Sequence, residues 1–270
     1  LGHYDAALRK AEKYLKAENI YFEEGINEEL GATAVWGTQQ VNMYQGAKYD
    51  GVFGIWYGKG PGVDRSGDVL RHANAAGTSP LGGVLAIAGD DHACKSSTIP
   101  HQSDHSFYST MLPMLYPANM QEFVEYGLLG IAMSRFSGCW SAFKVTSDTA
   151  ESTGVVDLTR ENRKILIPGD DEFEMPEGGL HIRPDDVWRE QDFRLQRYKL
   201  FAALAFGKKN KIDRVIWDSS KPRFGIITSG KTYGDVRQAL YELGIDEAVA
   251  EKIGLRLYKV GMPWPLEPEG

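Results

Sequence analysis

The chain has 270 residues, of which 42% are hydrophobic and 25% are charged, which is enough to bury one large core or one core and part of a second. Its formal net charge of -7 is spread along the chain, so the composition excludes the concentrated basic surface that a nucleic acid requires. No run approaches the roughly 18 apolar residues of a membrane span and no signal-peptide pattern opens the chain, so we expect a cytoplasmic protein without membrane association.

The first half of the chain alternates between helical and extended patterns. Apolar side chains recur at helical spacing over 3–18, whereas 51–57 and 83–88 are apolar runs typical of buried strands. The expected elements are helices at 3–18 and 28–44, a strand at 51–57, a helix at 64–76, a strand at 83–88, helices at 105–115 and 119–136, and a strand at 140–144. Strands and helices that alternate with short connections predict an α/β fold, in which helices cover both faces of a mostly parallel sheet.

The pattern weakens over residues 151–212, which hold an acidic stretch with prolines and glycines and then a charged helix over about 185–209. This composition is typical of a connector between domains. Residues 213–270 resume the alternation, with a strand at 224–230, a helix at 231–243 and a strand at 255–260. One β-α-β unit is too small for a complete domain, so we expect a first domain at 1–150 and only the start of a second α/β unit after the connector.

Polar loops at 58–65 and 89–105 leave the ends of two expected strands. Ligands of parallel sheets bind outside the carboxyl ends of the strands, so both loops are expected to line one crevice. The first loop opens with the glycine-rich run Gly58-Lys59-Gly60-Pro61-Gly62, which matches neither common phosphate-binding motif. On spacing alone it indicates a tight turn in which Lys59 is solvated.

The second loop concentrates His92, His101 and His105, which are three of the six histidines in the chain. A metal site is one interpretation, but the spacing fits no helical pair of histidines, and a loop at a strand end is more typical of a substrate cleft. A purely structural alternative is that Ser103 or Asp104 caps the following helix while the histidines satisfy the loop backbone. We therefore expect no metal in this chain.

Glu28 lies in the first turn of an expected helix whose N-cap is Asn27. A carboxylate at this position is usually a surface residue that matches the helix dipole, as Glu29 is expected to be. Small and apolar residues follow Glu28, so its side chain is able to face the sheet instead of water.

Several long and compositionally unusual runs resemble the bacterial indolepyruvate ferredoxin oxidoreductase family. They are Gly25–Gly37, Trp56–Asp68, Gly89–His92 with its continuation His101–Asp104, and Leu257–Leu266. The resemblance covers most of 1–150 and returns at 213–268, whereas the connector carries little of it. It implies that 1–150 is the pyrimidine-binding domain of a thiamine-diphosphate fold, without its first strand, and that 213–270 opens a transketolase C-terminal-like domain.

The same resemblance implies a reaction and roles for individual residues. The reaction is oxidative decarboxylation of an aryl pyruvate, an indolepyruvate-like 2-oxoacid, to its acyl-CoA, with electrons passed to ferredoxin. Glu28 falls on the catalytic glutamate that hydrogen-bonds the aminopyrimidine ring of thiamine diphosphate. Gly58, Lys59 and Gly60 are then expected beside the cofactor. Candidates for binding the substrate, by their position at the strand ends, are His92, Lys95, Ser96 and His101.

Other parts of such an enzyme are expected outside this sequence. Cys94 and Cys139 are too few to hold an iron–sulfur cluster, so the clusters, like the diphosphate-binding domain with its magnesium ligands, belong to another segment or subunit. The chain starts at Leu1, and we expect a fragment that is inactive alone and functions in a homo-oligomer. Two alternatives remain open: a non-catalytic partner-binding module of the same fold, and a non-oxidative thiamine-diphosphate enzyme such as a transketolase-like enzyme.

Overall fold

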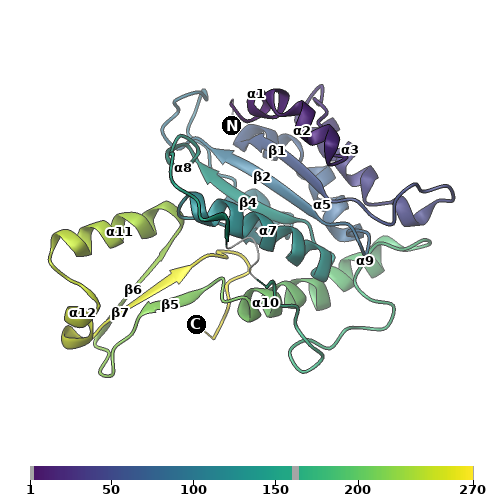
Figure 1. The fold of residues 1–270 in the computed structure, drawn as a ribbon. Helices are drawn as coiled ribbons and strands as arrows, with labels where there is room; N and C mark the ends of the chain where they lie inside the picture. Colours follow the sequence, from purple (N-terminus) through teal and green to yellow (C-terminus); the bar gives the residue numbers. More distant parts are fainter. Residues whose placement is uncertain (1–2, 160–163, 270) are drawn as a thin grey trace.

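The computed structural model describes residues 3–159 and 164–269, which form two sheets joined by helices (Figure 1). The first sheet has four parallel strands in the order β1-β2-β4-β3. Its strands are β1 Gly54–Lys59, β2 Val84–Asp90, β3 Met114–Leu115 and β4 Ser141–Thr146. The expected parallel sheet is therefore confirmed. A loop follows β2 as expected, but the loop expected at 58–65 is wrong, because the helix Gly60–Arg65 follows β1 directly and the glycine-rich loop of 58–62 is a junction between strand and helix.

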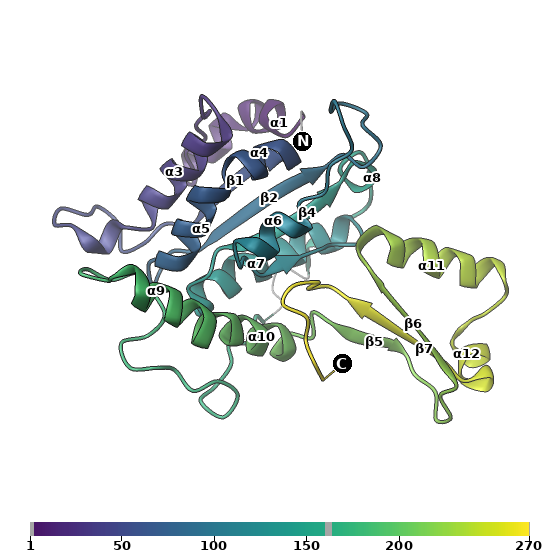
Figure 2. The same ribbon diagram turned by 180° about the vertical axis from the view of Figure 1, so that it is seen from behind.

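Helices cover both faces of this sheet (Figure 2). The described helices of the first half are α1 Tyr4–Lys10, α2 Glu12–Ala17, α3 Glu28–Thr38, η1 Val41–Met43, α4 Gly60–Arg65, α5 Gly67–Ala76, α6 Asp104–Ser109, α7 Met120–Ser137 and α8 Ser147–Ala150. On one face, α3, α4, α5 and α6 pack against alternate strand residues such as Ala86 and Ala88. On the other face, α7 packs against the intervening residues Leu85 and Phe143. Successive side chains of a strand point to opposite faces of the sheet and thus pack into two separate apolar cores.

Several helices are shorter than the sequence predicts. The helix expected over 105–115 ends at Ser109, because Met111 has a positive φ of 58° and Pro113 cannot continue a helix. Met114 and Leu115 then pair with β4 as a short edge strand. The helix expected over 3–18 is interrupted at Ala11, and the one expected over 64–76 is instead the pair α4 and α5.

The charged helix of the connector begins at Trp188 instead of residue 185, since Asp185 has a positive φ of 59° and follows Pro184. It consists of α9 Trp188–Arg194, the π-helical turn η3 Leu195–Lys199 and α10 Leu200–Lys209. The π turn lies where Lys199 becomes fully buried, and α10 completes the second apolar core with Ala203 and Phe206.

The second sheet contains the expected β-α-β unit and two elements that the sequence pattern did not reveal. Its described elements are β5 Arg214–Trp217, β6 Phe224–Ser229, α11 Gly230–Glu242, α12 Glu247–Ile253 and β7 Leu255–Val260. The order is β5-β7-β6, with β6 parallel and β5 antiparallel to the central β7. The side chain of Asp246 caps α12 by accepting a hydrogen bond from the Val249 N–H at 2.9 Å, a signal present in the sequence but overlooked.

A buried ion cluster joins the two sheets. The fully buried ammonium of Lys259 on β7 donates to Glu122 on α7, and Arg214 of β5 donates to the same carboxylate oxygen at 3.3 Å. The limits and roles of the three predicted domains stay predictions. None of the described helices combines the length and hydropathy that a bilayer-spanning segment needs.

Candidate functional site

Two hydrogen bonds fix the start of α3 against the sheet. The side chain of Asn27 accepts from the Leu30 N–H at 2.9 Å, which confirms it as the N-cap. The indole Nε1 of the buried Trp56 on β1 donates to the backbone carbonyl of Glu28 at 2.9 Å. The backbone of Glu28 is therefore held by the strand whose end carries the glycine-rich loop.

The glycine-rich loop is shaped around the Glu28 side chain. A Cβ atom at position 62 would lie 2.4 Å from Cγ and 3.0 Å from Cδ of Glu28, so only a glycine leaves the carboxylate in its place. A Cβ atom at position 58 would lie 3.5 Å from the same Cγ and 2.9 Å from the Trp56 ring. Gly58 and Gly62 thus supply the space that Glu28 occupies, instead of a cradle for phosphate.

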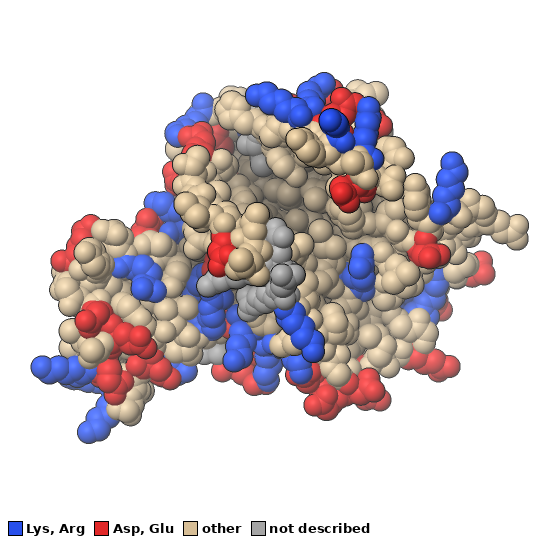
Figure 3. All heavy atoms as spheres, in the orientation of Figure 1, with Lys and Arg blue, Asp and Glu red and all other residues tan. Residues whose placement is uncertain are grey.

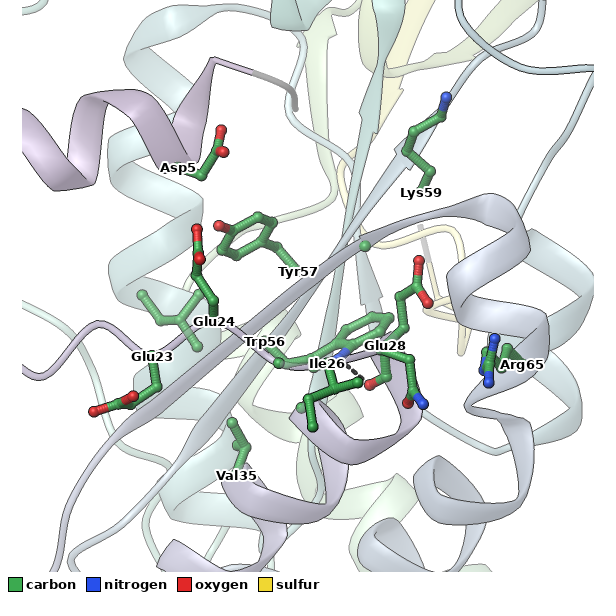
Figure 4. A pocket seen from close by; sticks show the side chains of 15 residues that line it. Asp5, Glu23, Glu24, Ile26, Glu28, Val35, Trp56, Tyr57, Lys59 and Arg65 are labelled. Atoms are coloured by element: carbon green, nitrogen blue, oxygen red, sulfur yellow. Dashed lines mark hydrogen bonds between the residues drawn. The ribbon is translucent and has the colours of Figure 1, made fainter.

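The half-buried Glu28 lines a pocket of about 620 Å³ on the β1 edge of the first sheet (Figure 4). The pocket is lined by Asp5, Glu23, Glu24, Gly25, Ile26, Asn27, Glu28, Gly31, Val35, Ile55, Trp56, Tyr57, Gly58, Lys59 and Arg65. Figure 4 shows the Glu28 carboxylate above the Trp56 ring, pointing along β1. Among the described residues, none forms a hydrogen bond or ion pair with this carboxylate, so it is available to a ligand in a pocket of drug-sized volume.

His101 is also brought to the glycine-rich loop. A Cβ atom at position 60 would lie 1.8 Å from His101 Nδ1, so Gly60 makes room for the imidazole as Gly62 does for Glu28. His101 Nε2 lies 2.8 Å from Asp64 Oδ2, and Ser106 Oγ donates to the other Asp64 oxygen at 2.7 Å. Partial burial raises the pKa of Asp64, but the hydrogen bonds from His101 and Ser106 outweigh it and leave this pKa below its ordinary value.

Asp91 organises the second loop. Its carboxylate accepts hydrogen bonds from the N–H groups of Ser96 at 2.8 Å and Lys95 at 2.9 Å, and from Ser147 Oγ at 3.2 Å. These bonds, led by the one from Ser96, lower the pKa of Asp91 to about 2, because they favour the charged form. Asp91 is therefore a structural anion within the loop and is not free to transfer protons at neutral pH.

A second buried carboxylate ties the loop to α6. Asp90 accepts from the Ser103 N–H at 2.9 Å and from Ser103 Oγ at 2.7 Å. The buried Lys144 on β4 lies 2.6 Å from Asp104 and 3.8 Å from Asp90. Neither Ser103 nor Asp104 caps α6 with its side chain, so the capping alternative raised from the sequence is wrong.

Of the other predicted residues, Lys59 lines the pocket, whereas His92, Lys95 and Ser96 are not among its lining residues. Lys59 Nζ donates to the backbone carbonyl of Ser96 at 2.5 Å and to Ser96 Oγ at 3.1 Å. These two hydrogen bonds connect the glycine-rich loop to the second loop. Lys95 turns away to an exposed ion pair with Glu151 at 2.7 Å. His92 is exposed, and its Nδ1 contacts the His101 carbonyl at 3.2 Å. These positions leave Glu28, Gly58, Gly60 and His101 gathered around the loop, with Lys59 and Ser96 bridging it.

The described charged side chains on the face shown in Figure 3 do not gather into a patch of one sign. Over the described residues of the face shown in Figure 3, Lys and Arg side chains are interspersed with Asp and Glu side chains. Within residues 3–159 and 164–269, no group of three or more His, Cys, Asp or Glu side chains is placed to hold a metal ion.

Sequence reasoning missed Asp64, Gly62, Trp56 and Arg65. The contact of Asp64 with His101 joins residues 37 positions apart, and no local pattern signals it. Gly62 was visible as part of the glycine-rich loop, but its role depends on the side chain of a helix that precedes it by more than thirty residues. Arg65 lines the pocket from the last turn of α4, where it reads as an ordinary surface cation.

Comparison with known proteins finds likenesses to indolepyruvate oxidoreductases. The family described as "Indolepyruvate oxidoreductase domain" matches residues 214–270. The indolepyruvate oxidoreductase subunit IorA of Methanothermobacter marburgensis is 25% identical over 242 residues, which are 88% of this chain and 36% of that protein. IorA of Methanothermobacter thermautotrophicus is 22% identical over 257 residues, covering 93% of this chain and 37% of that protein. The chain thus spans little more than a third of these relatives.

The fold has a solved counterpart. A structure of 2-oxoglutarate:ferredoxin oxidoreductase from Magnetococcus marinus, with 2-oxoglutarate, coenzyme A and succinyl-CoA bound, matches 97% of this chain and 49% of that chain. The TM-score is 0.62 at 13% sequence identity, so this likeness is one of fold. The resemblance seen in the sequence is confirmed as a likeness: the chain is similar in sequence to indolepyruvate oxidoreductase subunit IorA and similar in fold to a 2-oxoacid:ferredoxin oxidoreductase.

Proposed function

We propose that this chain is the part of a thiamine-diphosphate-dependent 2-oxoacid:ferredoxin oxidoreductase that binds the aminopyrimidine ring of the cofactor. The whole enzyme would convert an aryl pyruvate to its acyl-CoA and pass the electrons to ferredoxin. The observation that carries the proposal is the Glu28 carboxylate, which has no partner among the described residues and faces a pocket of about 620 Å³.

The described residues around Glu28 fit an aminopyrimidine ring. A carboxylate that accepts no protein hydrogen bond is ready to accept one from a ring nitrogen, and the adjacent Trp56 offers an apolar surface. Gly58 and Gly62 keep side chains away from the carboxylate, so a planar group can approach it closely. The hydrogen bond from Trp56 and the Asn27 cap fix the backbone of Glu28 in the first turn of α3.

Bound thiamine diphosphate supplies the carbon nucleophile that attacks a 2-oxo group, and this chemistry needs a proton relay at the aminopyrimidine. Glu28 provides the protein end of the relay by holding or releasing one proton at its carboxylate oxygen. His101, oriented by Asp64, and the Lys59–Ser96 bridge fix the loop that borders the relay. These residues keep the relay geometry constant during turnover.

The remaining functions belong to partners of this chain. A diphosphate-binding domain with magnesium, iron–sulfur clusters, coenzyme A and ferredoxin complete the proposed reaction. The solved counterpart is a ferredoxin oxidoreductase with coenzyme A bound, which supports the last two of these partners. Localisation in the cytoplasm and assembly into a homo-oligomer are part of the same proposal.

The test is Glu28→Gln in the full-length protein, because glutamine keeps the size of the side chain but cannot carry the proton. We expect kcat for arylpyruvate-dependent ferredoxin reduction to fall by about 10²- to 10⁴-fold, the range of general acid–base catalysis. Glu29→Gln is the matched control, since Glu29 is the exposed neighbour on the same helix turn and should leave kcat unchanged.

Three results would contradict the proposal. A Glu28→Gln enzyme that reduces ferredoxin at the wild-type rate would remove the relay role. Wild-type protein that binds its partner chain but neither thiamine diphosphate nor a 2-oxoacid would favour a non-catalytic module. Release of an aldehyde without coenzyme A or ferredoxin would identify a non-oxidative enzyme.

A further inference from the structure

The pocket that contains Glu28 also contains one cation whose hydrogen-bond donors are not occupied by any described residue. Lys59 and Arg65 both line the pocket, but the Lys59 ammonium is committed to the Ser96 carbonyl and hydroxyl. Within residues 3–159 and 164–269, Arg65 forms no ion pair or side-chain hydrogen bond. Its guanidinium therefore offers its donors to a ligand.

Arg65 is placed close to Glu28 by helix geometry. It follows Gly62 by three positions on α4, so the two residues share one face of the helix, and Gly62 is the residue against which Glu28 packs. Glu28 and Arg65 nevertheless form no ion pair with each other, although both face the same pocket (Figure 4). Two unpaired opposite charges that border one pocket leave room for a ligand with complementary groups.

The other charges give the pocket two ends. Figure 4 shows Arg65 on the opposite side of Glu28 from Asp5, Glu23 and Glu24. Glu24 is paired with Arg9, whereas Asp5 and Glu23 add negative charge at that end. An anionic ligand group is repelled from the acidic end and attracted to the arginine end. Between them lies the apolar surface of Trp56.

We propose that Arg65 binds the carboxylate of the 2-oxoacid substrate and so sets the specificity of the pocket for an acid. This inference rests on the proposed function and adds a residue and a ligand group to it. The planar guanidinium can grip both carboxylate oxygens at once, which an ammonium cannot.

The experiment uses the full-length holoenzyme with Arg65→Gln, Arg65→Lys and, as control, Arg71→Gln. Arg71 lies on α5, is exposed and donates to Ser109, away from the pocket. We expect Arg65→Gln to raise the KM for indole-3-pyruvate roughly 10- to 100-fold with kcat within about threefold of wild type, as for a lost charge-assisted hydrogen-bonded pair. Arg65→Lys should recover only part of this loss, and Arg71→Gln should change nothing.

A binding measurement separates this inference from the role of Glu28. Calorimetry in the Glu28→Gln background, where turnover is blocked, compares indole-3-pyruvate with its uncharged methyl ester. Adding Arg65→Gln should weaken the acid but not the ester. If Glu28→Gln still turns over, the proposed function fails, but Arg65 is still tested by comparing the KM of the acid with the inhibition constant of the ester, which cannot lose carbon dioxide.

Two outcomes would overturn the assignment of Arg65. Equal losses for acid and ester would show that the arginine has only a structural role. Weaker binding of thiamine diphosphate with an unchanged KM for the acid would show that the guanidinium serves the anionic part of the cofactor instead. A thermal melt of each variant identifies any loss caused by misfolding.

Discussion

Gly62→Ala is the substitution that most directly tests how the loop positions Glu28. The new methyl carbon would lie 2.4 Å from Glu28 Cγ, whereas carbon atoms in ordinary contact are about 3.5 Å apart. Glu28 must therefore move by roughly 1 Å, because Gly62 is held within α4 and Trp56 fixes the Glu28 backbone. The α4 helix itself tolerates alanine well.

The expected effect on activity exceeds the effect on stability. A displacement of about 1 Å at a catalytic group lowers the rate by about 10²-fold, which corresponds to about 2.7 kcal/mol of transition-state stabilisation. Crowding by one methyl group costs about 1–3 kcal/mol of folding free energy, and rotation of the half-buried Glu28 side chain relieves much of it. We expect a folded enzyme with kcat reduced about 100-fold.

The assay is ferredoxin reduction by the full-length enzyme, with thermal unfolding measured on the same samples. Gly67→Ala is the matched control, since no atom lies within 4 Å of a Cβ at that position in the neighbouring helix. In the Glu28→Gln background, Gly62→Ala should add little further loss, because both changes disable one group. Wild-type turnover by a well-folded Gly62→Ala enzyme would refute the idea that the loop positions Glu28.

Two further predictions concern stability of the 270-residue chain, measured by urea unfolding. Glu122→Gln leaves the fully buried Lys259 without its carboxylate and should lower the free energy of unfolding by about 3–5 kcal/mol. Glu122→Leu combined with Lys259→Met should recover most of this loss, because no buried charge is left unpaired. The exposed control Glu174→Gln should be neutral, and equal stability of Glu122→Gln and Glu174→Gln would contradict the prediction. Burial lowers the pKa of Lys199 from 10.5 to about 8, so its charge costs stability below about pH 8 and this cost disappears as the pH rises toward the unfolded pKa. Relative to Lys199→Met, the wild-type chain should therefore gain about 2 kcal/mol between about pH 7.5 and about pH 9.5, and a constant difference would show that Lys199 titrates normally.

The local pattern was sufficient for much of the fold. Apolar runs ending in polar loops predicted β1 and β2, and the helix cap at Asn27 was readable from its side chain and the residues that follow. β5 was missed because four residues give too little alternation to separate a strand from a loop. Pro113 indicates that the helix must end before it, but the earlier end of α6 and the edge strand β3 depend on the backbone conformation at Met111, which no residue type there demands.

The candidate site was predictable in its members more than in its contacts. Glu28, Gly58 and Lys59 were expected beside the cofactor and all three line the pocket, whereas Gly60 instead makes room for His101; the roles of these residues stay predictions. Lys95 does not lie with them, because its ammonium pairs with Glu151 at 2.7 Å.

The amino-acid sequence by itself determined the strand and helix alternation, the two polar loops and the family resemblance, since each depends on residues adjacent along the chain. Only the tertiary structure decided which glycine faces which side chain, that Asp64 orients His101, and that Arg65 has no partner among the described residues although it lies beside Glu28. These relations join residues brought together when helices pack on the sheet, and the packing depends on side-chain volumes from both apolar cores at once.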